Sequence, residues 1–325
     1  MASRMTGSIP RILFTSLSGK VALYQAVLRQ SRLFHPKSKV LGVDCNPQCP
    51  AANEVELFRT VPPLDSISDD NLLDDLQKMR ITHILPSRDG ELHYWSSRQS
   101  LLQKNGYHLL CSQADAIGLC EDKVLLSQLK MPPSLNVIPC FSNTDQSFRG
   151  NWVVKERRDS SSRVIKVRVS ATDADKLASQ FVDPIFQPFI IGREFTAESW
   201  LDRTSTCRAV VLRWREKVIN GESHKTTIFR NPQWEEIVRQ LLDSIEGLHG
   251  HCLVQVIVDP NQQLHLVEIN PRLGGASPLS LSAGLNSILW SLQETNSPTE
   301  VTPDFNPRIG ASLTKIDGCV FISNP

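Results

Sequence analysis

The chain has 325 residues, enough for about two or three domains with buried cores. Apolar residues make up 40% of it and charged residues 21%, as in an ordinary soluble globular protein, and the formal net charge of +1 gives no basic footprint for a nucleic acid. No apolar stretch approaches the roughly 18 residues of a membrane span, and residues 1–9 lack the apolar core of a secretion signal. We therefore expect a cytoplasmic protein with no nucleic-acid or membrane partner, preceded by a disordered lead over residues 1–9.

Eight cysteines are scattered along the chain without a repeating frame. Cys45 and Cys49 are four positions apart, but no second pair of Cys or His follows at a spacing typical of zinc sites. We therefore interpret the cysteines as reduced thiols, as expected in the cytosol.

The N-terminal part alternates short apolar strands with amphipathic helices. The pattern predicts strands at Arg11–Thr15, Lys39–Asp44 and His83–Pro86, and helices at Val21–Arg32 and Asn71–Met79. This alternation predicts a parallel sheet with right-handed crossovers, so we expect a Rossmann-like domain over residues 10–118. The turn Ser16–Lys20 contains one glycine and fails the dinucleotide fingerprint, which argues against NAD binding despite the suitably spaced Asp44.

The rest of the chain has a different pattern. A helix is predicted from Asp122 to about Lys130, and residues 135–180 are strand-rich with one helix. Residues 185–325 are typical of an antiparallel sheet with helices. Their clearest features are a helix at Trp234–Leu248, a proline-rich loop at Ser297–Pro307, and terminal strands at Ala311–Lys315 and Val320–Ser323.

The segment His251–Gly275 carries the strongest chemical signal. It predicts two strands joined by a polar turn, and because side chains alternate along a strand, Glu268 and Asn270 share one face. A hairpin would bring Gln255 beside them. A carboxylate with two amide oxygens suits Mg²⁺, which keeps water and binds substrate phosphates, and the guanidinium of Arg272 suits a phosphate oxygen.

Glu268–Arg272, followed by Gly274 and Gly275, resembles the metal-binding signature of the ATP-grasp superfamily, in its carbamoyl-phosphate-synthase-like branch of carboxylate–amine ligases. Further segments resemble the same family in order and spacing over roughly residues 115–290: Asp122–Lys123 before the lid, Trp152–Lys155 as the strand whose lysine reaches the nucleotide phosphates, Ser160–Arg163 as the phosphate-covering loop, and Gln187–Thr196 as the adenine-binding hinge. The loop Arg157–Arg163 departs from the family pattern because its usual glycines are absent.

The resemblance implies an α/β and α+β fold. A Rossmann-like pre-ATP-grasp domain over residues 10–118 would be followed by a linker helix and lid subdomain over 119–190, and by an antiparallel-sheet C-terminal subdomain with the metal site over 191–325.

The resemblance also implies roles for individual residues. The expected metal ligands are Gln255, Glu268 and Asn270, and the expected catalytic residues are Lys155, Arg215 and Arg272. The expected nucleotide-binding residues are Lys123, Lys155, Ser161, Ser162, Arg163, Gln187, Pro188, Phe189, Ile190, Glu194 and Gln255.

The acceptor site is less well marked. Arg213 and Arg215, with the hairpin Asn220–Lys225, are expected beside the acceptor substrate, although an exposed charged hairpin explains this pattern equally well. Arg88 and Glu91 follow the third predicted strand, where ligands of open α/β sheets bind, and are candidates for the substrate carboxylate and amine. The sequence identifies no general base.

We therefore expect an ATP- and Mg²⁺-dependent ligase that activates a small carboxylic acid as an acyl phosphate for attack by an amine, releasing ADP. Two Mg²⁺ ions are expected, with Mn²⁺ as an alternative metal, and a homodimer is one assembly that the family allows. Two alternatives remain open: carboxyphosphate formation from bicarbonate, and a nucleotide-binding scaffold without turnover.

Overall fold

The computed structural model describes residues 9–323 apart from 145–147, 159–165, 298–299 and 317. Its N-terminal sheet is parallel throughout, with the strand order β3-β2-β1-β4-β5. The strands are β1 (Arg11–Phe14), β2 (Lys39–Asp44), β3 (Phe58–Thr60), β4 (His83–Leu85) and β5 (His108–Leu109), and the accompanying helices are α1 (Val21–Phe34), α2 (Asp69–Lys78), α3 (Asp89–Ser96) and α4 (Gln99–Lys104). The predicted parallel domain is confirmed.

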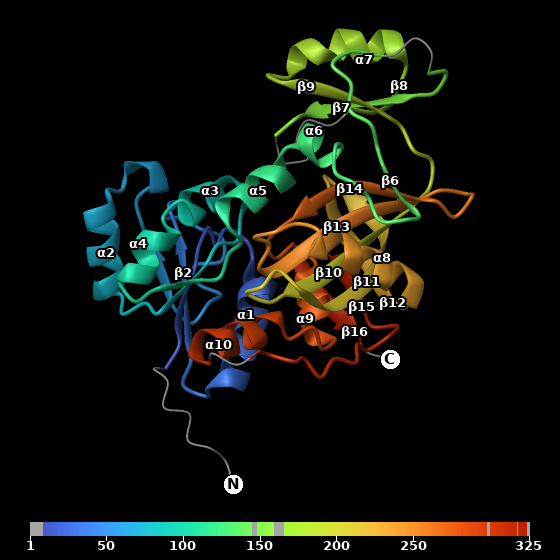
Figure 1. Ribbon diagram of the computed structural model, residues 1–325. Helices are drawn as coiled ribbons and strands as arrows, with labels where there is room; N and C mark the ends of the chain where they lie inside the picture. The colour runs from blue at the N-terminus through green and yellow to red at the C-terminus, as the bar shows by residue number, and fades with distance from the viewer. Residues whose placement is uncertain (1–8, 145–147, 159–165, 298–299, 317, 324–325) are drawn as a thin grey trace.

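A second, three-stranded sheet forms the lid. Its antiparallel order is β8-β7-β9, from β7 (Trp152–Glu156), β8 (Lys166–Val169) and β9 (Pro184–Pro188), and α7 (Ala171–Leu177) with a short 3₁₀ turn (Ala178–Gln180) packs on one side. The small core of this lid contains Trp152, Phe181 and Phe186. In Figure 1 the lid lies at the top, apart from the other two sheets.

The third sheet has eight strands in the order β16-β15-β12-β11-β10-β13-β14-β6. Their bounds are β6 (Leu135–Val137), β10 (Arg193–Leu201), β11 (Cys207–Ile219), β12 (Glu222–Phe229), β13 (Gly250–Val258), β14 (Leu264–Asn270), β15 (Ser312–Ile316) and β16 (Cys319–Ser323). Seven of these strands pair in antiparallel fashion, but β6 pairs in parallel with β14. The prediction of an antiparallel sheet starting near residue 185 was therefore incomplete, because β9 belongs to the lid and the distant β6 closes one edge.

The remaining helices are α5 (Ala114–Glu121), α6 (Lys123–Leu126), α8 (Pro232–Asp243), α9 (Ser277–Ser282) and α10 (Ser287–Asn296). Two predicted helices were too long. The helix expected up to Lys130 ends at Leu126, where the Ser127 hydroxyl donates to the Val124 carbonyl over 2.7 Å. The helix expected up to Leu248 ends at Asp243, where Ser244 donates to the Leu241 carbonyl over 2.6 Å. Serine competes in this way with the next helical hydrogen bond.

The N-terminal domain and the eight-stranded sheet are packed through α1, α9 and α10. The buried Gln30 of α1 donates to the carbonyls of Leu281 and Leu285 over 3.2 and 3.1 Å and accepts from the Ile288 amide over 3.0 Å. These bonds satisfy backbone groups between α9 and α10 and fix the two parts against each other. Within the described residues, every helix is too short or too polar to cross a membrane.

Candidate active site

One face of the eight-stranded sheet is polar, and the strand pairing explains why. Arg213 on β11 lies opposite Thr196 on β10, Thr196 lies opposite Gln255 on β13, and Gln255 lies opposite Glu268 on β14. This row of residues faces away from the apolar core packed against α8, because the neighbouring positions, such as Phe195 and Val256, point into that core. The predicted pairing of Gln255 with Glu268 is confirmed.

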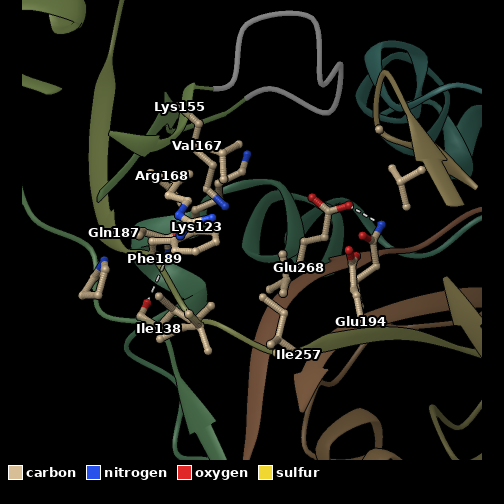
Figure 2. A pocket seen from close by; sticks show the side chains of 18 of the residues that line it. Lys123, Ile138, Lys155, Val167, Arg168, Gln187, Phe189, Glu194, Ile257 and Glu268 are labelled. Carbon is tan, nitrogen blue, oxygen red and sulfur yellow. Dashed lines mark hydrogen bonds between the residues drawn. The ribbon is translucent and has the colours of Figure 1, made fainter. Parts of the chain in front are cut away.

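A cavity of about 690 Å³ lies between this face and the lid. Residues from the lid sheet, the hinge and the sheet line it: Lys123, Ile138, Val153, Lys155, Glu156, Val167, Arg168, Gln187, Pro188, Phe189, Ile190, Ile191, Gly192, Glu194, Arg215, Val218, Asn220, Gly221, Gln255, Ile257, Val267 and Glu268. Figure 2 shows Lys123 and Lys155 on one side of the cavity and Glu194 and Glu268 on the other. The volume suits a ligand of nucleotide size.

Lys155 is a buried lysine in this nucleotide-sized cavity. Its side chain is only 6% exposed, yet its ammonium has no hydrogen-bond or ion-pair partner among the described residues. Burial, reinforced by the nearby Lys123, lowers the pKa of Lys155 to about 8, although Glu268 and Glu194 oppose the shift. A buried ammonium without a partner is strongly suited to an incoming anion.

Lys123 begins α6 directly after the buried Asp122, whose carboxylate caps the helix by accepting from the amides of Val124 and Leu125. The same carboxylate accepts two-point hydrogen bonds from Arg157 and from Arg158 at the end of β7. Burial opposes ionisation of Asp122, but the two guanidinium groups outweigh it and keep the pKa of the carboxyl below its ordinary value. One carboxylate therefore ties α6 to the base of the lid.

The predicted metal-binding residues lie together. The Glu268 carboxylate accepts hydrogen bonds from the side-chain amides of Gln255 over 2.5 Å and Asn270 over 2.8 Å. Among the described residues no group of three His, Cys, Asp or Glu side chains could hold a metal ion by itself. The donor set of one carboxylate and two amides fits Mg²⁺, which binds through few protein ligands together with phosphate oxygens and water.

Glu194 and Arg215 form an ion pair inside the cavity, with 2.8 Å between the Glu194 Oε1 and Arg215 Nε atoms. Burial raises the pKa of Glu194, against the effect of the Arg215 charge. Arg215 also donates to the Gly221 carbonyl over 2.8 Å, which fixes the guanidinium beside the β11–β12 turn.

The hinge residues Gln187, Pro188, Phe189 and Ile190 line the other end of the cavity. The side chain of Gln187 points away from a ligand, because it donates to the Ile138 carbonyl over 3.1 Å, as Figure 2 shows, and to the Cys140 sulfur over 3.2 Å. With Ile138 and Ile257 the hinge forms an apolar wall suited to a flat ring.

A second, more polar cavity of about 280 Å³ adjoins the first, and Gln255, Glu268 and Arg215 border both. Arg272 lines it and forms a two-point ion pair with Asp89 from the N-terminal domain. Arg213, predicted beside the substrate, lies in its wall but is only 2% exposed and donates to Glu198 over 2.7 Å. Its guanidinium is therefore largely committed within the protein.

Sequence reasoning missed the buried network behind this cavity. Glu198 accepts from Arg213 and pairs with His251 over 3.0 Å, and His251 contacts the Ser287 hydroxyl over 2.9 Å. Burial opposes ionisation of Glu198, but Arg213 and His251 outweigh it and lower its pKa to about 2. The available signal was a second carboxylate in β10, four positions after Glu194 and two positions before Trp200.

Two family models match the chain by sequence: an ATP-grasp domain over residues 120–276 and a PylC-like N-terminal domain over residues 12–110. Together they cover both parts of the site described above. This chain belongs to the ATP-grasp superfamily of ligases. A search of curated proteins found no match.

Solved structures of ATP-grasp enzymes share the fold. Biotin carboxylase from Campylobacter jejuni, in a β-γ-ATP complex, matches with a TM-score of 0.74 at 14% identity over 94% of this chain and 75% of that one. The biotin carboxylase domain dimer of 2-oxoglutarate carboxylase from Hydrogenobacter thermophilus, with MgADP, ADP and bicarbonate, gives 0.70 at 13% identity over 94% and 74%. L-amino acid ligase from Bacillus licheniformis gives 0.67 at 14% identity over 95% and 80%.

In this ATP-grasp protein, the predicted phosphate-loop residues Ser161, Ser162 and Arg163 lie outside the described residues. Arg88 and Glu91, the two candidates for substrate binding in the N-terminal domain, differ in exposure. Arg88 is exposed at the carboxyl edge of the parallel sheet, as expected, whereas Glu91 is only 1% exposed.

The Glu91 carboxylate is occupied by internal hydrogen bonds. It accepts from the hydroxyls of Thr15 and Ser16 over 2.7 and 3.0 Å, and from the amides of Ser87 and Arg88 over 2.8 and 3.0 Å. The expectation that Glu91 binds the substrate amine is therefore wrong for this conformation, since its acceptors already join the loops that follow β1 and β4. A carboxylate so engaged supports the site rather than contacting the ligand.

Proposed function

We propose that this protein is an ATP- and Mg²⁺-dependent ligase that activates a small carboxylic acid as an acyl phosphate and joins it to an amine. The observation that carries the proposal is Lys155, buried in a nucleotide-sized cavity without a partner among the described residues, with the oxygen-rich group of Gln255, Glu268 and Asn270 at the border of a second cavity. Glu268 borders both cavities, so the proposed phosphate site and the proposed site for the carboxylic acid would share its carboxylate.

In the proposed complex the adenine ring lies against the hinge from Gln187 to Ile190, and Glu194 lies near the ribose hydroxyls. The phosphates extend toward Lys123 and Lys155, whose positive charges favour them. Ion pairing with Arg215 keeps the Glu194 carboxylate oriented while its second oxygen can accept from a ribose hydroxyl.

Gln255, Glu268 and Asn270 would hold Mg²⁺. When bound, the metal neutralises phosphate oxygens and so favours transfer of the γ-phosphoryl group. The protein's own contribution is to fix Glu268 through two amide groups that both donate to its Oε1, which leaves Oε2 without a hydrogen bond among the described residues. Such a fixed arrangement avoids reorganisation during the reaction.

The second cavity would hold the acid, near Arg215 and Arg272. A carboxylate oxygen of the acid attacks the γ-phosphorus and ADP leaves. The amine then attacks the acyl carbon, loses a proton, and expels phosphate that retains one oxygen of the original carboxylate. The bond broken in ATP is thereby exchanged for an amide bond.

The test is ADP and phosphate release with Mg²⁺ and ATP across pools of carboxylic acids and amines, with Glu268→Ala as the control. We expect release that requires both an acid and an amine, reduced at least about 100-fold by Glu268→Ala, since loss of even outer-sphere metal partners costs about 10–100-fold. ATP binding without stimulated release in any pool would favour the scaffold alternative. Release with bicarbonate alone would favour carboxyphosphate chemistry.

A cytoplasmic homodimer remains our proposal for the state of the protein. Sedimentation at several protein concentrations tests the assembly directly, because a stable dimer would keep a doubled mass on dilution.

A further inference from the structure

The two-point contact between Asp89 and Arg272 joins residues 183 positions apart. Asp89 is the first residue of α3 in the N-terminal domain. Arg272 lies two residues after the end of β14 and lines the second cavity. The pair is well shielded, with side-chain exposures of 10% for Asp89 and 18% for Arg272. An ion pair so protected from water is stronger than an exposed one.

The contact uses one particular edge of the guanidinium group. Nε and Nη2 of Arg272 donate to the two oxygens of Asp89, and Nη1 donates to the Leu273 carbonyl over 3.0 Å. A guanidinium has five N–H groups, so one remains on each of the two terminal nitrogens. These two remaining N–H groups can donate to a carboxylate or an acyl phosphate in the cavity.

Asp89 is itself held by a rigid support. Just before it, the amides of Ser87 and Arg88 donate to the buried Glu91, and the ammonium of Lys20 donates to the Ser87 carbonyl over 3.1 Å. Lys20 also donates to the Ser16 carbonyl over 2.8 Å, so the loops after β1 and β4 are tied together. The start of α3 thus presents the Asp89 carboxylate from a fixed backbone.

We propose that Asp89 is a positioning residue. It binds one edge of the Arg272 guanidinium, so that the remaining N–H groups face the second cavity. Its negative charge also offsets the charge of Arg272, so that an anion binds there weakly enough to be released. The inference rests on the proposed function for its effect on turnover. It makes the N-terminal domain part of the acid-activating site through Asp89, although this residue contacts Arg272 and not the reacting atoms. Arg272 without Asp89 would be a less ordered and more strongly anion-binding group.

The first experiment measures the affinity for inorganic phosphate by calorimetry in the wild type, Asp89→Asn and Arg272→Ala, and in the double variant. We expect Asp89→Asn to bind phosphate about five-fold or more tightly, as removal of a close compensating charge implies, and Arg272→Ala to abolish this gain. An affinity in Asp89→Asn within two-fold of the wild type would overturn the inference, as would a gain that persists without Arg272.

The second experiment compares turnover. Asp89→Asn should lower kcat about ten-fold or more, as for a misplaced catalytic group, while KM for ATP changes less than two-fold, and Asp89→Glu should recover part of kcat. The matched control is Asp69→Asn, which removes the exposed ion pair between Asp69 and Arg98 in the same domain over 2.8 Å. A merely structural role would lower the melting temperature and leave kcat unchanged, against the inference.

The two proposals fail in different ways. A wild type without acid-dependent ADP release contradicts the proposed function, while the phosphate measurement still decides the role of Asp89. A wild type that turns over, with Asp89→Asn equal to it in kcat and in phosphate affinity, contradicts the inference alone.

Discussion

The two cavities differ in how their cations are balanced. In the nucleotide-sized cavity the ammonium of Lys155 is buried without a partner among the described residues. Each guanidinium that borders the second cavity already faces a carboxylate: Arg213 pairs with Glu198, Arg272 with Asp89, and Arg215, which borders both cavities, with Glu194.

This difference indicates two kinds of recognition. A buried ammonium without a partner destabilises the folded protein in the absence of a ligand. An anion that pairs with it removes this cost, and the free energy recovered adds to the affinity for the anion. Compensated guanidinium groups fix directions for hydrogen bonds while adding little net charge, which suits an intermediate that must form and leave. The variants below should therefore have opposite effects on stability in the two cavities.

The largest effect is expected behind the second cavity. Glu198→Ala would leave Arg213 buried without its main partner, so we expect the free energy of unfolding to fall by about 3–5 kcal/mol. Urea denaturation measures this change. A loss below about 1 kcal/mol, the value typical of exposed pairs, would show that Arg213 does not depend on Glu198.

Lys155→Met should act in the opposite sense. Removing a buried cation that has no partner in the described part of the chain, while keeping its apolar stem, should leave the melting temperature unchanged or raise it. Affinity for ATP should fall about 10–100-fold through loss of charged hydrogen bonds. Calorimetric titration with ATP and thermal unfolding measure the two quantities on one sample. A strongly destabilised variant would contradict the description of Lys155 as unpartnered.

The pH dependence of activity and of stability tests the same role of Lys155. The folded-state pKa of Lys155, about 8, lies below its ordinary value of 10.5, so the folded protein loses this proton first as the pH rises. We expect kcat/KM for ATP to fall as the pH rises through about 8. The contribution of Lys155 to the free energy of unfolding should increase between about pH 8 and 10.5, because the unfolded chain holds this proton longer.

Lys155→Arg is the control for this pH profile, since arginine stays protonated in this range. It should flatten the decline. Lys20, whose pKa burial also lowers to about 8, would be the responsible group if the decline persisted in Lys155→Arg.

The smallest effect is expected at the base of the lid. Asp122→Asn keeps the cap of α6 but weakens the hold on Arg157 and Arg158, so we expect a loss of about 1–2 kcal/mol in unfolding free energy. Affinity for ATP should change less than that of Lys155→Met. An equal or larger loss of affinity would place the lid base, rather than the buried ammonium, at the centre of nucleotide binding.

Local pattern was enough to predict much of the fold. The strand Lys39–Asp44 has its predicted bounds, and the alternation along His251–Gly275 correctly placed Gln255 opposite Glu268. These features depend on side-chain periodicity, which neighbouring residues determine. Helix ends were predicted less well, because serines such as Ser127 and Ser244 end α6 and α8 through single hydrogen bonds.

The missed parts of the site depend on contacts between distant segments. Asp89 meets Arg272, and Glu198 meets His251, only after separate strands and domains have packed. Nothing in the sequence near Glu91 distinguished a supporting carboxylate from a ligand-binding one, because its four donors come from the loops after two different strands. A single sequence carries no periodic signal for such pairs.

The most direct test of the central claim follows the oxygen atoms. With a responsive acid labelled with ¹⁸O in both carboxylate oxygens, the proposed acyl phosphate requires that each phosphate released carries one ¹⁸O, which phosphorus NMR or mass spectrometry detects. We predict one labelled oxygen per turnover, in step with ADP release. Phosphate free of label, released together with the amide product, would contradict activation of the acid through an acyl phosphate.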